Sequence, residues 1–294
     1  MRKYKFEAPQ SFEELFEIMH RANFEKDEIK FVAGGTDFVP RLNFELNMIP
    51  SEQKQPLQIM YLGCLGIDSI IEKDGIISIG ACCKLNDIMK NPVICEKLPV
   101  LVETISQMAG LTIRNTGTIG GNIMNASPAN DSIPTFIVLD ANFILKSEKK
   151  ERTVKASEFF TGPGKTVAKP DEVLTRIEIN LKKGHASFKK LGRRQAETLS
   201  VVNAAAYVEQ ENSVCKTVRV AVGSVGPTVI RCERVEVALR GKKLTEDVIK
   251  TASLKVLNEI NPIDDLRASA WYRNKTAPVM VSRAIKAAAG IRGE

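Results

Sequence analysis

The sequence has few of the residues with which proteins hold metals. Only two histidines, His20 and His185, occur among its 294 residues, and its six cysteines form no C-x-x-C pair. No set of Cys and His residues therefore has the spacing of a zinc or iron–sulfur site. Neither histidine lies near a serine or cysteine nucleophile of the kind that a hydrolytic triad needs. The chain is expected to hold no metal of its own, and the adjacent Cys82 and Cys83 are expected in a buried strand.

Long apolar runs are missing too. The first ten residues, MRKYKFEAPQ, contain no apolar core of a secretion signal, and no stretch approaches the ~20 apolar residues of a membrane span. We expect a cytoplasmic protein with reduced thiols that does not act at a membrane. With 44% hydrophobic and 26% charged residues, the composition is that of an ordinary globular protein.

Acidic residues are outnumbered, since 42 Lys and Arg stand against 35 Asp and Glu and give a formal charge of +7. The densest basic stretch, Lys189-Lys190 followed by Arg193-Arg194, is too short for a polybasic arm. The excess suits an anionic ligand or an acidic partner surface. A solvated basic surface is favoured over a nucleic-acid site, and no nucleic-acid partner is expected.

Helix and strand signals alternate through the first 180 residues. Ser11 with Glu14 forms a capping box, which predicts a helix through about Ala22. Further helices are expected at 98–109 and 133–139, and loops at 44–56 and 111–125. Asp74-Gly75 predicts a hairpin turn. Strands are expected at 29–33, 58–62, 67–72, 76–80, 142–146 and 173–179.

The pattern changes after Lys182-Lys183-Gly184, which is the expected domain boundary. Beyond it, strands are expected at 201–209 and 217–222, and amphipathic helices at 229–239, 247–258 and 277–289. The length suits two domains. The prediction is an α+β chain with a first domain over 1–180, subdivided at about 57/58, and a second domain over 181–294.

The first of two Gly-Gly loops follows a predicted strand and reads Phe31-Val32-Ala33-Gly34-Gly35-Thr36-Asp37-Phe38. Glycines let backbone N–H groups approach a ligand without a Cβ in the way. Successive exposed N–H groups form an anion nest suited to a pyrophosphate, and Thr36 can add a hydroxyl. The competing interpretation is a tight turn, because short glycine motifs often occur by chance.

The second loop runs from Arg114 to Ile123 and contains Thr118-Ile119-Gly120-Gly121-Asn122. It continues through Ala126-Ser127-Pro128 to Asp131 and Pro134. A long polar loop must satisfy its backbone groups, and within a compact domain such loops are usually functional. Two Gly-rich loops fit a dinucleotide clamped from both sides better than they fit two coincidental turns.

Two other nucleotide-binding patterns are excluded. No G-x-G-x-x-G follows a strand, so the Rossmann pattern is absent. Gly164-Lys165-Thr166 ends like a phosphate-binding Walker loop, but the first glycine of that motif would have to stand at Phe159.

The two Gly-Gly loops and the Ala126-Ser127-Pro128…Asp131 segment resemble the FAD-binding (medium) subunits of molybdenum hydroxylases. This family includes xanthine dehydrogenase, carbon monoxide dehydrogenase and nicotinate dehydrogenase. The resemblance continues through Ser200–Ala205 and Gly223–Thr228 and covers nearly the whole chain. It implies an FAD-binding domain of the vanillyl-alcohol oxidase type, made of two α/β subdomains. A C-terminal α+β domain with a sheet and a helical bundle would follow.

The resemblance also implies residue roles. The first loop, including Phe31 and Val32 to Phe38, would hold the FAD pyrophosphate, and Thr118 to Asn122 would close over its other side. Asp131 matches a residue that contacts FAD. Leu174 and Lys189 match positions near the flavin ring. Met108 stands where some relatives have an aromatic that stacks on the flavin. No His or Cys matches a covalent attachment site, so non-covalent FAD is expected.

By the same resemblance, the molybdopterin and [2Fe-2S] clusters belong to partner subunits, because this chain has neither the cysteine sets nor the length to hold them. Electrons would pass from those clusters through FAD to NAD(P)+, after a partner hydroxylates an N-heterocycle such as xanthine or nicotinate. No residue of this chain is expected to be catalytic.

Two alternatives stay open. One is a self-sufficient FAD-dependent reductase of the same fold, which would need a donor such as Ser132 or Arg193. The other is a non-catalytic nucleotide- or nucleic-acid-binding protein.

Overall fold

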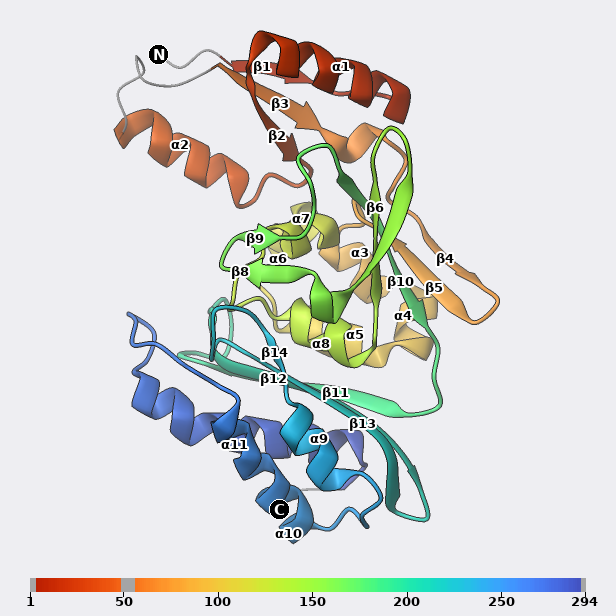
Figure 1. Cartoon of the computed structure of the whole chain (residues 1–294), viewed down its shortest axis with the longest axis vertical. Helices are drawn as coiled ribbons and strands as arrows, with labels where there is room; N and C mark the ends of the chain where they lie inside the picture. The colour runs from red at the N-terminus through yellow and green to blue at the C-terminus, as the bar shows by residue number, and fades with distance from the viewer. Residues whose placement is uncertain (1–3, 49–55, 292–294) are drawn as a thin grey trace.

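The computed structural model describes residues 4–48 and 56–291, and in them each large sheet comes from one contiguous part of the chain. Figure 1 shows the three sheets following one another along the long axis of the molecule, from the N-terminal strands at one end to the C-terminal helices at the other. The mixture of helices and sheets agrees with the predicted α+β class. No helix in the described ranges is long and apolar enough to cross a bilayer.

The N-terminal part is a small parallel sheet with one helix packed on it, in the strand order β1-β3-β2. The capping box is confirmed, because the Ser11 side chain accepts a hydrogen bond from the Glu14 N–H and caps α1. Leu15, Phe16 and Met19 of α1 are buried against this sheet. The elements of this part are β1 (Tyr4–Glu7), α1 (Phe12–Glu25), β2 (Glu28–Val32), α2 (Phe38–Met48) and β3 (Leu57–Tyr61).

Two sequence expectations change here. The predicted loop over 44–56 is wrong at its start, because α2 continues to Met48; positions 49–55 lie outside the described residues. Leu42 and Leu46 have the four-residue spacing of a helix, a signal that the nearby prolines at 50 and 56 obscured. Strand β3 crosses the expected subdivision at 57/58, since Leu57–Tyr61 pairs with both β1 and β2.

The middle part is an antiparallel sheet, β4-β5-β10-β6-β7, with short helices packed on it. Its core includes Phe136, Phe143 and Phe159, and the last two rings meet edge to face at 4.9 Å. The elements are β4 (Ile70–Lys73), β5 (Ile76–Gly80), α3 (Leu85–Lys90), α4 (Pro92–Lys97), α5 (Pro99–Ser106), α6 (Leu111–Thr116), α7 (Ile119–Met124), α8 (Ser132–Val138), β6 (Asn142–Lys146), β7 (Glu151–Lys155), β8 (Phe160–Gly162), β9 (Lys165–Thr166) and β10 (Val173–Asn180).

The predicted loop over 111–125 is wrong, because it forms α6 and α7. Its Gly and Asn residues have poor helix propensity, but distant contacts override propensity in such short helices. Cys82 and Cys83 are buried as expected, yet they lie in the turn after β5 and not in a strand. The Cys83 N–H donates to the carbonyl of Gly80, which closes that turn.

The C-terminal part begins after residues 181–184 and is a second antiparallel sheet, β11-β12-β13-β14, with helices on one face. Strand β11 was not predicted, and α11 begins at Ala270 and not at 277, capped by the Ser269 side chain. The expected helix at 229–239 begins only at Glu233, because Ile230–Arg231 pairs as β14. The elements are β11 (His185–Gly192), β12 (Ser200–Glu211), β13 (Val214–Gly223), β14 (Ile230–Arg231), α9 (Glu233–Leu239), α10 (Glu246–Ser253), a 3-10 helix (Leu254–Asn258) and α11 (Ala270–Ala288).

Strand β12 is buried on both faces, which explains its continuous apolar sequence. Ala205 and Tyr207 pack into the core of the middle part, whereas Ala204 and Ala206 pack against the C-terminal helices. Because successive strand residues point to opposite faces, this one strand joins two cores and fixes the C-terminal sheet against the middle of the molecule.

Candidate functional site

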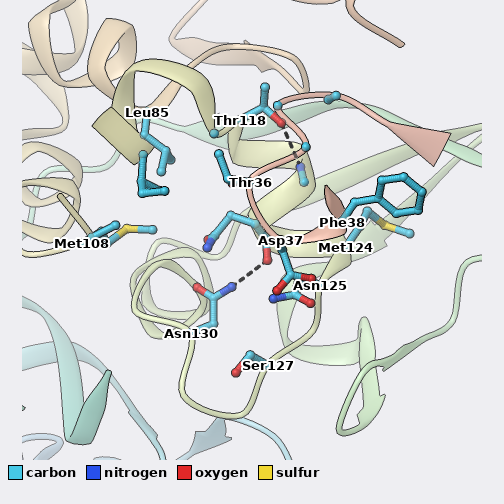
Figure 2. Close-up of a pocket in the computed structure, with 18 of the residues that line it drawn as sticks. Thr36, Asp37, Phe38, Leu85, Met108, Thr118, Met124, Asn125, Ser127 and Asn130 are labelled. Carbon is cyan, nitrogen blue, oxygen red and sulfur yellow. Dashed lines mark hydrogen bonds between the residues drawn. The ribbon is translucent and has the colours of Figure 1, made fainter. Parts of the chain in front are cut away.

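A cavity of about 840 Å³ lies where the N-terminal sheet, the middle helices and the tip of the β11–β12 connection meet. This volume is near the upper end of the range for small-molecule sites, about 300–1,000 Å³. Figure 2 shows its wall, with Thr36 to Phe38 on one strand-to-helix turn and Thr118 to Asn130 on another segment. The cavity is thus enclosed by segments that are distant in the sequence.

The first wall is the turn between β2 and α2. The N–H groups of Gly34, Gly35, Thr36 and Asp37 have no hydrogen-bond acceptor in the described ranges. All of these residues line the cavity, and Gly35 has a left-handed φ of 68° that glycine adopts without strain. Such a row of free N–H groups is an anion nest.

The two Gly-Gly loops touch each other at the backbone. A Cβ on Gly34 would lie 2.2 Å from the carbonyl oxygen of Thr116 and 2.8 Å from the Cα of Gly117. Any side chain at 34 would force the loops apart. The glycine there is required by this close approach and not by its φ.

The two glycines of the second loop have different roles, because Gly120 packs against the protein and Gly121 lines the cavity. The N–H groups of Ile119 and Gly120 donate to the carbonyls of Cys83 and Ala81, so they are not free for a ligand. A Cβ on Gly120 would lie 2.6 Å from that of Ala81, and neither Ile119 nor Gly120 lines the cavity. Gly121, in contrast, faces the cavity, and its N–H donates to the Thr118 hydroxyl, the N-cap of α7.

Hydrogen bonds from Asn130 and Ser132 hold Asn122 in place in this wall of the cavity. Asn130 donates to the carbonyl of Asn122 at 2.7 Å (Figure 2), and the Ser132 hydroxyl donates to the side-chain oxygen of Asn122 at 2.6 Å. The Asn122 side chain is therefore held in one orientation at the cavity surface. Ser132, which the reductase alternative needs as a proton donor, is fully buried and engaged in this network.

Asp131 links the cavity to the C-terminal sheet. One carboxylate oxygen accepts hydrogen bonds from Ser200 at 2.5 Å and from Asn203 at 2.8 Å. The other accepts from the ammonium of Lys190 at 2.7 Å. Both carboxylate oxygens are occupied by protein groups, so Asp131 joins two parts of the fold as well as lining the cavity.

Arg41 spans the rim of the cavity. Its Nε lies 2.8 Å from the Asp37 carboxylate, and its Nη2 donates to the side-chain oxygen of Asn125 at 3.0 Å. Figure 2 shows Asp37 and Asn125 on the same side of the cavity. The arginine thus connects α2 to α7, the two helices whose loops form the opposing walls.

The structure brings most of the predicted site residues together. Those that line the cavity are Phe31, Val32, Ala33, Gly34, Gly35, Thr36, Asp37, Phe38, Met108, Thr118, Gly121, Asn122 and Asp131. Four do not line it: Ile119 and Gly120 anchor α7, Leu174 is buried in the core on β10, and Lys189 pairs with Glu103 at 2.6 Å. The neighbouring Lys190, and not Lys189, reaches Asp131.

Several lining residues were not singled out from the sequence. They include Arg41, Leu85, Ala109, Gly110, Ile113, Asn125, Asn130 and the segment Glu197–Leu199. Asn130 lies within the segment that the sequence analysis followed from Ala126 to Pro134 without assigning it a role, and Asn125 immediately precedes that segment. Nothing local points to Glu197, which comes from a distant hairpin.

Thiol chemistry is not available at this site. Burial raises the pKa of Cys82 to about 12 and that of Cys83 to about 11, so both remain protonated near neutral pH. In the described ranges, no group of His, Cys, Asp and Glu residues could hold a metal ion. A phosphate-bearing ligand fits the wall of N–H groups at Gly34–Asp37, and the cavity is also lined by Lys30 and Leu57 of the N-terminal sheet and by Met108 and Leu199 of the later segments. A dinucleotide such as FAD fits this arrangement.

Comparison with known proteins agrees with this. Residues 2–181 match the family profile described as the FAD-binding domain in molybdopterin dehydrogenase, and residues 186–288 match the C-terminal domain of carbon monoxide dehydrogenase flavoproteins. The chain is 31% identical over 272 residues to the glyceraldehyde dehydrogenase medium chain of Sulfolobus acidocaldarius, covering 90% of this chain and 96% of that one.

Other relatives extend the comparison. The chain is 27% identical to the nicotinate dehydrogenase FAD-subunit of Eubacterium barkeri, covering 94% of this chain and 93% of that one. In three dimensions, it superposes on a chain of carbon monoxide dehydrogenase from Hydrogenophaga pseudoflava with a TM-score of 0.91, at 28% identity and with 99% of each chain covered.

Proposed function

The chain belongs to the family of FAD-binding subunits of the molybdopterin dehydrogenases, and we propose that it carries electrons from iron–sulfur clusters of a partner subunit through FAD to NAD(P)+. It is therefore an oxidoreductase subunit. The observation that carries the proposal is the row of N–H groups at Gly34–Asp37, which have no acceptor among the described residues and belong to residues that line a dinucleotide-sized cavity.

The residues of this chain bind and orient the cofactor. The N–H groups from Gly34 to Asp37 would hold the pyrophosphate, since an anion nest compensates its charge without a side chain. Gly121 and Asn122 would cover its other side. Lys30 and Leu57 would contact the adenosine half, and Met108 would offer an apolar contact to the flavin ring. Bound FAD supplies both one-electron and hydride transfer, which suits a junction between clusters and a nicotinamide.

Hydroxylation of substrate is assigned to a partner. The relatives named above act, by their names, on an aldehyde, carbon monoxide and a nitrogen heterocycle, yet they share similar identity with this chain. We propose a molybdopterin-binding subunit and an iron–sulfur subunit as partners, and an N-heterocycle such as nicotinate or xanthine as substrate.

Two further expectations are part of this proposal. We place the domain boundary at the connection between β10 and β11, near residues 181–184, where the chain leaves the middle sheet for the C-terminal one. We place the complex in the cytoplasm, where the six unpaired cysteines of this chain would stay reduced.

The experiment compares the isolated chain with the reconstituted complex. The isolated chain should bind FAD and transfer electrons from NADH or NADPH to a dye, and it should hydroxylate no heterocycle. Adding the partner subunits should establish hydroxylation coupled to NAD(P)+ reduction. Hydroxylation or reduction of an organic substrate by the isolated chain would instead support the self-sufficient reductase. A chain that binds no flavin would contradict both.

A further inference from the structure

The turn between α5 and α6 has its carbonyl groups fixed by two cations. Nη1 of Arg114 donates to the carbonyl of Met108 and to that of Ala109, each at 2.7 Å. The ammonium of Lys190 donates to the preceding carbonyl, that of Gln107, at 2.8 Å. Three successive peptide groups therefore have their oxygens directed at positive charge, which also compensates the partial negative charge at the end of α5.

The N–H groups of the same peptides point the other way. A trans peptide directs its N–H opposite to its carbonyl, and no described peptide bond is cis. The N–H groups of Ala109 and Gly110 therefore point away from Arg114. Met108, Ala109 and Gly110 line the cavity, but Arg114 does not, so these two N–H groups lie on the cavity side of the turn. Neither has an acceptor in the described ranges.

Two features show that this orientation is imposed and not relaxed. Ala109 has a left-handed φ of 44°, which a residue with a Cβ adopts at a cost. The Nε of Arg114 is buried without a hydrogen-bond partner, so the guanidinium holds this position although one of its donors makes no hydrogen bond.

We infer that Arg114 is a positioning residue, which sets the N–H groups of Ala109 and Gly110 as a donor pair for the acceptor edge of the flavin ring. The inference rests on the proposed function, because it needs a flavin at this end of the cavity. The pyrimidine portion of a flavin presents adjacent oxygen and nitrogen acceptors, which two neighbouring donors can meet together. That portion gains negative charge when the flavin is reduced, so the donor pair favours the reduced form.

The test replaces Arg114 and measures the flavin itself. Arg114→Met keeps the length of the side chain but removes its donors, so the turn is released and the two N–H groups lose their alignment. The holoprotein should then have a more negative flavin midpoint potential by dye equilibration, and FAD affinity about tenfold weaker for the loss of two hydrogen bonds. Arg114→Lys, which keeps a donor and the charge, should restore most of both.

Arg240→Met is the matched control. It removes the same charge from an exposed arginine at the end of α9, which does not line the cavity and does not contact the turn. Its flavin potential should stay at the wild-type value. An equal shift in both methionine variants would show that only the overall charge matters, and an unchanged potential in Arg114→Met would overturn the inference.

A second variant covers the case in which Arg114→Met does not fold. Gly110→Pro deletes one of the two N–H groups and keeps Arg114; the φ of −88° at Gly110 lies just outside the usual range of proline, and the new Cβ would meet only the end of the flexible Glu197 side chain. It should shift the potential in the same direction, and a wild-type potential in this variant would also overturn the inference. Failure of the wild-type chain to bind FAD would contradict the proposed function, which is a separate outcome.

Discussion

The ammonium of Lys190 lies 2.7 Å from the carboxylate of Asp131, and both side chains are almost fully buried, with 6% and 9% of their surfaces exposed. The pair connects β11 of the C-terminal sheet to the residue that precedes α8, at the wall of the cavity. Breaking one side of a buried ion pair leaves the other charge unpaired, which costs about 3–5 kcal/mol.

The first prediction concerns this pair. Lys190→Met should lower the stability of the chain by about 3 kcal/mol, because the Asp131 carboxylate stays buried without its countercharge. It should also loosen the C-terminal sheet, so trypsin should cleave faster after the exposed Lys182 or Lys183. Urea unfolding and timed proteolysis measure the two effects. The control is Lys189→Met, whose pair with Glu103 is about one third exposed and contributes about 0–1 kcal/mol. Equal losses in both variants would contradict the distinction.

The second prediction separates the two glycines of the second loop. Gly121→Val should abolish FAD binding while leaving thermal stability of the apo-chain near wild type, because Gly121 faces the cavity. Gly120→Ala should instead destabilise the fold by about 1–3 kcal/mol, since its Cβ would overlap Ala81. Flavin titration and calorimetry measure these effects. Full FAD occupancy in Gly121→Val would mean that this loop does not contact the cofactor.

The third prediction concerns how the cofactor is held. All flavin should leave the protein on acid or heat denaturation, as FAD, with none attached to the precipitate. The reason is that no His or Cys is among the described residues that line the cavity, and burial keeps Cys82 and Cys83, in the turn after β5, protonated. Chromatography of the supernatant identifies the flavin. Flavin retained in the pellet, or FMN in the supernatant, would be inconsistent with this picture.

The fourth prediction concerns pH. Burial alone would raise the pKa of Asp265, but hydrogen bonds from the Arg267 side chain and from the N–H groups of Arg267 and Ala268 hold it far below its usual value. Asp265 also pairs with the fully buried Arg273 at 2.7 Å. Because the folded pKa is lowered, the stabilisation is complete above the usual pKa, near 4, and is lost as the pH falls further.

Asp265→Ala should therefore be strongly destabilised at pH 7, by about 3 kcal/mol or more, because Arg273 loses its countercharge. The difference from wild type in urea unfolding should narrow as the pH falls below about 4. Asp264→Ala is the control, since Asp264 accepts only a backbone hydrogen bond from Ala270 and should cost about 1 kcal/mol. A difference that does not change with pH would contradict the assigned role of the carboxylate.

The fifth prediction concerns thiol reactivity. Iodoacetamide at pH 8 should label the exposed Cys95 well before Cys82 or Cys83 in the native chain. The thiolate is the reactive form, and burial raises the pKa of the latter two to about 12 and 11. Mass spectrometry of peptides measures the order. Early labelling of Cys82 would show that the turn after β5 opens readily.

Short sequence patterns were enough to predict the elements that depend on neighbouring residues alone. The cap at Ser11, the strand at Asn142–Lys146 and the hairpin at Asp74-Gly75 are all confirmed, and both of those hairpin residues have positive φ. Helix α7 was missed because its first N–H groups donate to the carbonyls of Ala81 and Cys83, and α6 because the Gly117 carbonyl at its end accepts from the Leu85 N–H; all of these partners are distant in sequence. Propensity cannot register such bonds.

The lining residues that belong to the Gly-Gly motifs could be predicted from the sequence. Those whose position depends on strand register or on distant contacts could be predicted less well. Lys189 and Lys190 are adjacent on β11, so they point to opposite faces, and only the register of that strand determines which reaches Asp131. An error of one residue in the register of β11 would therefore assign the contact with Asp131 to Lys189, whose own ion pair is about one third exposed, and not to Lys190, whose ion pair is buried. Arg114 was noticed only as part of a motif, because its contacts depend on a turn whose shape the sequence does not display.

The backbone contact between Gly34 and Thr116 also bears on redesign of this site. It sets the spacing of the two loops through main-chain atoms, so a side chain at 34 would widen the gap and no substitution elsewhere in the lining would bring the loops closer together. Libraries that keep Gly34 and vary the other lining side chains would therefore alter the ends of the cavity and leave the distance between the two loops at its present value. A bulkier cofactor analogue in the middle of the cavity would require a change in loop length.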